Sequence, residues 1–363
     1  MLSYFETRTR IIALLAIGAS LAALLLRIGG GGSVAVFVAS AVGLAGLAAM
    51  VGEGTEQLGH RLGPGATGVL QSALGNLPEL FIGLFALRAG LVDVVRSALV
   101  GSILANTLLV LGLAFVAGGL RHGPQTFGTN QTKMMSTLLI LAVAAIAIPT
   151  IATSPGQPDQ GHATELSVIV SIVLLAVFVA SVPYSIGRGP GVGTAESAES
   201  AQSAEHVWPL WLAIGSLFLA ALGAVFVSDW FVEALRPAMS ALGMSETFAG
   251  LVVVAIAGNA VENVVGVQAM LRDKGDLAIS LILNSSLQVA LALTPVLVIL
   301  SLVMGGAALT LVVSPLLVAA LALATLLAAF IVIDGESSWL EGLALIGLYV
   351  IVAASVWWGQ PIG

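Results

Sequence analysis

The chain has 363 residues, of which only 31 are charged: 12 are Lys or Arg and 19 are Asp or Glu. Soluble domains carry a charge on about a quarter of their residues, whereas this chain is 58% hydrophobic and has a mean hydropathy of +1.08. The composition excludes a soluble globular protein and predicts an all-α integral membrane protein. The net charge of −7 excludes nucleic acid as an expected partner.

Apolar stretches of about 20 residues, the length that crosses the hydrocarbon core, recur along the chain. The first follows Arg8 and Arg10, and we interpret it as a retained helix because no small-x-small cleavage pattern comes after it. We predict about eleven transmembrane spans. They lie at about 9–27, 32–51, 65–88, 93–117, 134–153, 164–187, 208–229, 246–270, 277–302, 308–333 and 338–358.

The positions of Lys and Arg predict the orientation. With the N-terminus in the cytoplasm, eight of the 12 basic residues fall on the cytoplasmic side and four outside, as the positive-inside rule requires. An odd number of spans then places the C-terminus outside. The one long polar connection, 188–207, is rich in Gly, Ala, Ser and Glu, which predicts a flexible acidic linker on the cytoplasmic side.

An internal repeat organises the chain. The segment Gly-Asn-Leu-Pro-Glu at 75–79 matches Gly-Asn-Ala-Val-Glu at 258–262, and the same offset carries Asp93 onto Asp276. Each copy holds five predicted spans, so the second copy has the opposite orientation, which is typical of secondary transporters. The predicted divisions are an extra N-terminal helix at 1–28, a first five-helix repeat at 29–187, the linker at 188–207 and an inverted second repeat at 208–363.

Two acids interrupt otherwise apolar spans. Glu79 and Glu262 occupy equivalent points of the two copies, and a carboxylate inside the membrane is costly enough to indicate function. Polar side chains accompany each acid: an Asn lies three residues before it, on the same face of a helix, and the following span carries a Ser and an amide on one face. These candidate ligands are Asn76, Asn259, Ser102, Asn106, Ser285 and Gln288.

All these groups offer oxygen, which suits a hard cation. Calcium takes about six to eight oxygen ligands in flexible geometry, whereas magnesium demands a stricter octahedron. Two carboxylates neutralise one divalent ion, and when the ion leaves, their mutual repulsion favours protonation. We therefore expect Glu79 and Glu262 to bind either Ca²⁺ or protons, which is the basis of an antiporter. The amides and serines have a competing interpretation as groups that only join helices.

The same residues carry a family resemblance. The stretches 75–90 and 101–112, and Gly-Asn-Ala-Val-Glu-Asn at 258–263 followed by Ser285 and Gln288, resemble the two alpha-repeats of the Ca²⁺/H⁺ antiporters of the calcium/cation antiporter superfamily. The resemblance covers nearly the whole chain. It implies that the repeat glutamates bind the transported ion and that the polar residues complete the site. Asn263 departs from the His of many members, and Asn284 departs from the usual Gly, where it alters helix packing or adds an oxygen ligand.

The resemblance implies a Ca²⁺ exporter of the cell inner membrane that uses external protons and alternates access as its two halves move. The alternatives are an exchanger of Na⁺ for Ca²⁺ and another divalent-cation antiporter. A cation channel is disfavoured because the paired acids would trap a divalent ion. An intramembrane enzyme is disfavoured because the chain lacks the motifs His-Glu-x-x-His and Gly-x-Gly-Asp. It also has no cysteine and no Walker-type loop. We expect no enzymatic activity and no resident cofactor; the partners are Ca²⁺, protons and lipid, and a homo-oligomer stays possible.

Overall fold

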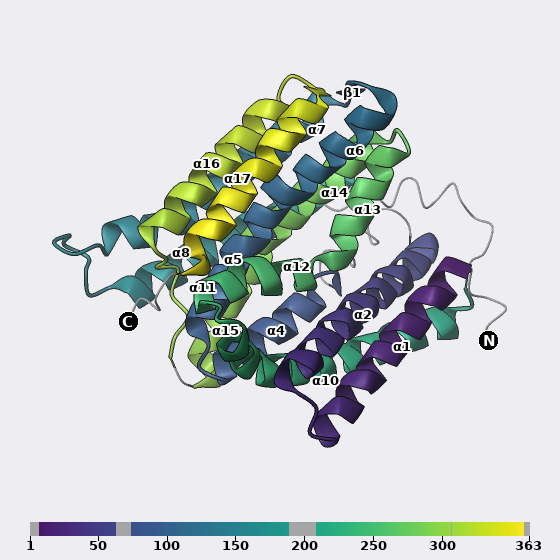
Figure 1. Cartoon of the computed structure of the whole chain (residues 1–363). Helices are drawn as coiled ribbons and strands as arrows, with labels where there is room; N and C mark the ends of the chain where they lie inside the picture. Colours follow the sequence, from purple (N-terminus) through teal and green to yellow (C-terminus); the bar gives the residue numbers. More distant parts are fainter. Residues whose placement is uncertain (1–6, 63–73, 189–207, 306, 359–363) are drawn as a thin grey trace. The chain divides into compact units, whose positions relative to one another are not determined.

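The structure is a computed structural model that describes residues 7–62, 74–188, 208–305 and 307–358 (Figure 1). Nearly all of these residues are helical, which confirms the all-α membrane fold. Among the described residues, nine helices are long and apolar enough to cross a membrane, and a bent pair makes ten. The predicted count of eleven is not confirmed, because part of the third predicted span and nearly all of the linker fall outside the described residues.

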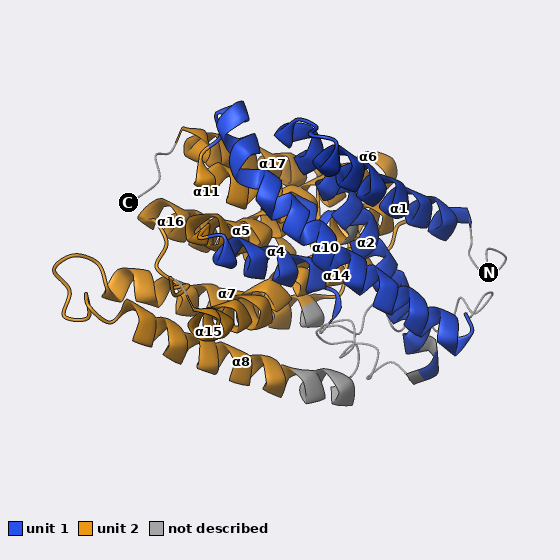
Figure 2. Ribbon diagram, turned by 90° about the horizontal axis from the view of Figure 1, so that it is seen from below, with its two compact units in different colours: residues 1–89, 185–244, 257–261 blue, residues 90–184, 245–256, 262–363 orange. Residues whose placement is uncertain are grey.

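The chain divides into two compact units, coloured separately in Figure 2. Unit 1 contains residues 1–89, 185–244 and 257–261, and unit 2 contains residues 90–184, 245–256 and 262–363. Each unit therefore combines segments of both predicted repeats. The repeat boundaries stay a prediction from the sequence. The compact units divide the chain at other positions.

Among its described residues, unit 1 contains the helices α1 (Thr7–Ile28), α2 (Ser33–Leu62), α4 (Leu77–Arg88) and α10 (Leu210–Leu242), together with the short segment 257–261. Small residues let them approach closely, as is usual where lipid provides no hydrophobic drive between helices. An ideal Cβ on Gly46 would lie 2.7 Å from Ala16 Cα, so α1 and α2 touch at backbone distance. Phe37 stacks on Phe231 with ring centroids 4.7 Å apart, which joins α2 to α10.

Helix α10 extends well beyond the predicted span. The sequence predicts an end near residue 229 because charges begin there, but the helix continues to Leu242 and ends at Gly243, whose φ of +66° suits a glycine C-cap. Glu233 lies on this extension and accepts a hydrogen bond from Arg27 Nε at 2.8 Å. Charge therefore does not mark the end of the helix here.

Unit 2 contains the remaining helices. Three of its helices contain π-helical segments, named η. The elements are α5 (Val92–Leu104), η2 (Ala105–Val110), α6 (Leu111–His122), α7 (Thr129–Ala152), α8 (Ala163–Arg188), α11 (Glu246–Phe248), η3 (Ala249–Val254), α12 (Ala255–Gly258), α13 (Ala260–Leu271), α14 (Gly275–Gln288), η4 (Val289–Leu293), α15 (Thr294–Met304), α16 (Pro315–Val332) and α17 (Trp339–Trp357). A two-residue antiparallel pair, β1 (Gln125–Thr126) with β2 (Glu336–Ser337), joins two loops.

Glycines again set the contacts between helices. A Cβ on Gly101 would overlap the carbonyl oxygen of Leu251, and one on Gly112 would lie 2.7 Å from the carbonyl oxygen of Gly342. Helix α5 thus packs directly on η3, and α6 packs on α17. These contacts fix α5 and α6, the helices on either side of Asn106 in the first repeat.

The π-helical segments η2 and η4 lie beside the two buried amides of the repeats. Ser102 and Ser285 share the offset of the Gly-Asn segments, whereas the offset between Asn106 and Gln288 is shorter by one position. Segment η2 begins at Ala105, before Asn106, and η4 begins at Val289, after Gln288. The first repeat thus places its amide four residues after the serine and inside the π-helical segment, and the second places it three residues after the serine and just before that segment.

Candidate functional site

Both membrane acids lie at the beginning of a helix. Glu79 is in the first turn of α4, which starts after Asn76 and contains Pro78, and Glu262 is in the first turn of α13. In the second repeat, the helical segments Glu246–Gly258 and Glu262–Leu271 are bent by 63° relative to one another. The helix is therefore broken at the Gly-Asn step of the second repeat.

Glu79 is held by residues of the other repeat. Asn259 is fully buried, and its Nδ2 donates a hydrogen bond to Glu79 Oε1 at 2.5 Å. Gly258 makes this approach possible, because a Cβ there would lie 2.6 Å from Glu79 Cγ and 3.0 Å from Oε1. The Gly-Asn step of the second repeat therefore forms a cradle for the acid of the first repeat.

A second polar contact lies inside unit 2. Asn106, in η2, donates from Nδ2 to Ser285 Oγ of α14 at 2.9 Å, and both side chains are buried. Ser102 and Gln288 belong to the same two helices and are also buried, at 3% and 6% exposure. The two spans that were predicted to supply matching polar groups are thus joined through those groups.

Several buried carboxylate and amide oxygens of unit 2 have no hydrogen-bond partner among the described residues. They are Glu262 Oε2, Asn263 Oδ1 and Asn284 Oδ1. Buried polar atoms are normally satisfied, so each such atom needs an explanation. Oxygen atoms that accept no hydrogen bond are free to coordinate a cation, and both asparagines are positions where the sequence departs from the family pattern.

The predicted candidates thus fall into two groups. In unit 1, Glu79 and Asn259 are brought together, and Asn76 lies just ahead of α4. In unit 2, Asn106 and Ser285 are brought together, while Ser102, Gln288 and Glu262 are positioned on the neighbouring elements named above. The sequence missed the role of Gly258, although a glycine directly before the asparagine in both copies was a visible signal.

The chemistry of these groups is that of a transport site. Their side chains supply carboxylate, amide and hydroxyl oxygens, which are ligands for a hard cation. Duplicated spans with broken helices and acids in the membrane are the architecture of secondary transporters. That is the class that the fold and the site define.

Comparison with known proteins gives the family. A family model described as sodium/calcium exchanger protein matches residues 32–187 and 212–358. The chain belongs to this family. It is 36% identical over 340 residues to a Ca²⁺/H⁺ antiporter of Synechocystis, covering 89% of this chain and 91% of the relative. It is 35% identical to the Ca²⁺/H⁺ antiporter ChaA of Bacillus subtilis, covering 88% and 91% of the two chains.

Solved structures share the fold. The structure of native YfkE matches with a TM-score of 0.80 and 30% identity, over 95% of this chain and 99% of that one. The H⁺/Ca²⁺ exchanger CAX matches with a TM-score of 0.74 at 15% identity, over 96% of this chain and 92% of that one. The second likeness concerns the fold alone. Together they confirm a multi-pass membrane fold of the cation exchanger type.

Proposed function

We propose that the protein is a Ca²⁺/H⁺ antiporter of the cell inner membrane that exports cytoplasmic Ca²⁺ in exchange for external protons by alternating access. The observation that carries the proposal is the contact between Glu79 and Asn259, which holds a membrane carboxylate on the amide of the opposite repeat. Two relatives that are named Ca²⁺/H⁺ antiporters, at 36% and 35% identity, support the same function. Ca²⁺ and protons are substrates here, and no resident cofactor and no enzymatic activity are part of the proposal.

The proposed roles follow from charge. Glu79 and Glu262 supply the two negative charges that neutralise one Ca²⁺, and they take up protons when the ion leaves, because two uncompensated carboxylates in a poorly solvated site repel one another. Asn76, Asn259, Asn106, Gln288, Ser102 and Ser285 supply or orient the neutral oxygens. The same acids therefore carry both substrates in turn.

The test is Ca²⁺ uptake into everted membrane vesicles energised by a proton gradient. The wild-type protein should accumulate Ca²⁺, and collapsing the gradient with a protonophore should release it. Glu79→Gln and Glu262→Gln should each abolish uptake, because each removes one charge from the site. Uptake that persists in either variant would refute the role of that glutamate, and no uptake by wild-type protein would refute the function.

Sodium is the alternative counter-ion, because the matching family model is described as sodium/calcium exchanger protein. The same vesicles distinguish the two exchangers when a sodium gradient replaces the proton gradient. We expect no Ca²⁺ uptake under the sodium gradient alone. Uptake driven by sodium and insensitive to the protonophore would replace this proposal by Na⁺/Ca²⁺ exchange.

The proposed orientation has a cytoplasmic N-terminus and an external C-terminus. It is supported by the distribution of the basic residues, eight of 12 on the cytoplasmic side. A C-terminal alkaline phosphatase fusion should be active and a C-terminal fluorescent protein dark, because the first folds only outside the cytoplasm. The opposite pair of results would invert the orientation.

A further inference from the structure

Unit 2 contains two loops that occupy equivalent positions in the two repeats. The first crossover loop, residues 123–128, joins α6 to α7, and the second crossover loop, residues 307–314, lies between α15 and α16. Each follows a helix that ends at a glycine with positive φ, +85° at Gly123 and +73° at Gly305. The loops are therefore counterparts, and they lie at opposite ends of the helices of their unit.

The first crossover loop is bound to the start of α14. The backbone N–H of Gly128 donates to Oδ1 of Asp276 at 2.5 Å, and the N–H of Phe127 donates to the carbonyl of Gly335 at 2.9 Å. Gly275 allows this contact, because a Cβ there would lie 3.0 Å from the carbonyl oxygen of Thr126. Asp276 thus binds a loop of the first repeat to a helix of the second.

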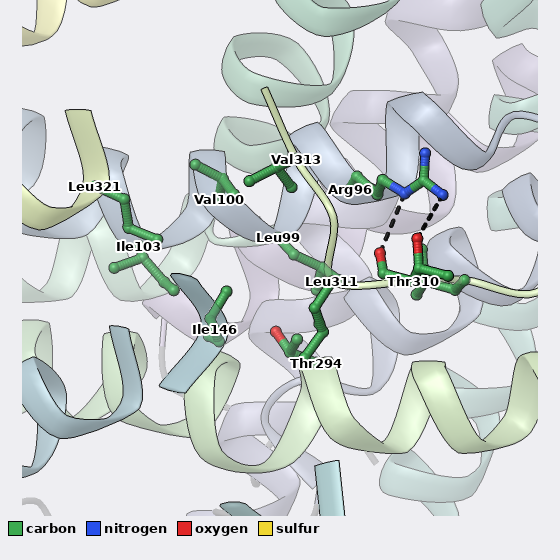
Figure 3. A pocket seen from close by; sticks show the side chains of 11 residues that line it. Arg96, Leu99, Val100, Ile103, Ile146, Thr294, Thr310, Leu311, Val313 and Leu321 are labelled. Atoms are coloured by element: carbon green, nitrogen blue, oxygen red, sulfur yellow. Dashed lines mark hydrogen bonds between the residues drawn. The ribbon is translucent and has the colours of Figure 1, made fainter. Parts of the chain in front are cut away.

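The second crossover loop is bound to the start of α5. Arg96 donates from Nε to the carbonyl oxygen of Thr310 at 3.1 Å and from Nη2 to Thr310 Oγ1 at 2.9 Å, as the dashed lines in Figure 3 show. Its third donor, Nη1, binds Asp93 Oδ1 at 2.7 Å. The planar fork of the guanidinium is held by Asp93 on one side and binds the loop on the other.

Other side chains continue the second attachment. Ser167 accepts from the N–H of Leu311 at 2.9 Å, and Thr150 accepts from the N–H of Val313 at 3.0 Å. Leu309 and Leu311 are buried, and beneath the loop lies a mostly apolar cavity of about 20 Å³. The loop is thus bound along its length and packed over an apolar floor.

We propose that Asp93 and Asp276 are paired positioning residues for the transport site. They share the offset that relates Glu79 to Glu262, so they occupy equivalent points of the repeats, and each lies in the first turn of a helix that carries site groups. Asp93 acts through Arg96 on the second crossover loop, and Asp276 acts directly on the first. In both attachments a helix of one repeat is bound to a loop of the other. Each repeat therefore fixes the position of a helix of the other repeat along that helix's axis.

A helix transmits this position to the site because it is stiff along its axis. At 1.5 Å per residue, Asp276 lies about 14 Å from Ser285 along α14, and Asp93 lies about 20 Å from Asn106 along α5 and η2. If either helix moves along its axis, the Asn106 to Ser285 hydrogen bond of 2.9 Å must change. The two attachments stay closed during transport, since they set the geometry that the ion meets.

The test measures the half-saturating Ca²⁺ concentration and the maximal rate of uptake per amount of folded protein. Asp276→Ala, Asp93→Asn and Arg96→Lys should raise half-saturating Ca²⁺ by about two- to tenfold, the effect of one lost hydrogen bond, with little change in maximal rate. Lysine should not replace arginine here, because its compact ammonium lacks the planar fork that reaches Asp93 on one side and Thr310 on the other. Matched controls are Asp273→Asn, three residues from Asp276, and Asp159→Asn, both exposed, which should behave as wild type. Equal half-saturation in attachment and control variants would overturn the proposal.

A cross-link between β1 and β2 tests whether the first crossover loop stays fixed during transport. This test does not depend on the folding of those variants. Gln125 and Ser337 are partners across β1 and β2, a spacing suited to a disulfide, and the chain has no other cysteine. The oxidised Gln125→Cys/Ser337→Cys protein should transport as well as its reduced form. Loss of transport on oxidation, reversed by reductant, would overturn the proposal and indicate a moving gate. Because the readout rests on the proposed function, failure of wild-type uptake would refute that function and is distinct from either result.

Discussion

Glu79 lies so close to Gly258 that an alanine at position 258 has no room. A Cβ there would be 2.6 Å from Glu79 Cγ, whereas ordinary contact begins at 3.4 Å, so the side chain must move by the difference, 0.8 Å. Oxygen ligands lie about 2.3–2.6 Å from a bound Ca²⁺, so a displacement of 0.8 Å takes the carboxylate out of that range. The move also breaks or stretches the hydrogen bond from Asn259, and such a bond to a charged group contributes roughly 1.5–3 kcal/mol. At about 1.4 kcal/mol per factor of ten, Gly258→Ala should raise half-saturating Ca²⁺ roughly tenfold or more.

The assay is proton-driven Ca²⁺ uptake over a range of Ca²⁺ concentrations, corrected for the amount of folded protein. Gly215→Ala is the matched control, because Gly215 lies in α10 of the same unit and a Cβ there meets nothing within 4 Å. This control should leave half-saturation unchanged. If Gly258→Ala and Gly215→Ala gave the same half-saturation, the carboxylate of Glu79 would not be held at the position on which this reasoning depends.

Three further predictions concern unit 2 and the bound ion. Asn106→Ala and Ser285→Ala should be non-additive in Ca²⁺ affinity, with a coupling energy of about 1 kcal/mol, because each removes the same hydrogen bond; additive effects would contradict that coupling. Asn263→Ala should weaken Ca²⁺ binding whereas Val264→Ala, whose side chain is 53% exposed, should not; equal affinities would mean that Asn263 Oδ1 is not a ligand. Ca²⁺ should raise the thermal midpoint of the detergent-solubilised protein more at alkaline than at acid pH, because protons compete for the same carboxylates; a pH-independent shift would exclude that competition.

The helices could be predicted from the sequence because the bilayer imposes a simple rule. Within the described residues, the apolar stretches of sufficient length are helical, since backbone groups in lipid must be satisfied within the segment. The ends were less accurate where charge and helix do not coincide, as in α10, which continues past Asp229 to Leu242. The π-helical segments could not be foreseen from hydropathy or turn signals.

The site residues could be named from the repeat, but their partners could not. Asn259 precedes Glu262 by three residues, and a continuous helix would place both on one face. The helix ends at Gly258 and restarts at Ala260, so that face is broken, and Asn259 binds Glu79 instead. Sequence spacing gives neighbours within a helix, whereas contacts between repeats depend on packing that no local pattern encodes.

The contacts between repeats have a common form that bears on how the protein moves. Asn259 of the second repeat holds Glu79 of the first, Asp276 of the second holds Gly128 of the first, and Arg96 of the first holds Thr310 of the second. Separating the repeats as two rigid halves would break all three attachments, including the bond from the fully buried Asn259, and a buried donor that loses its acceptor costs about 1–3 kcal/mol. A transport movement that preserves them has to divide the chain elsewhere. Each of the three attachments lies within one compact unit: the Asn259 to Glu79 contact in unit 1, and the other two in unit 2.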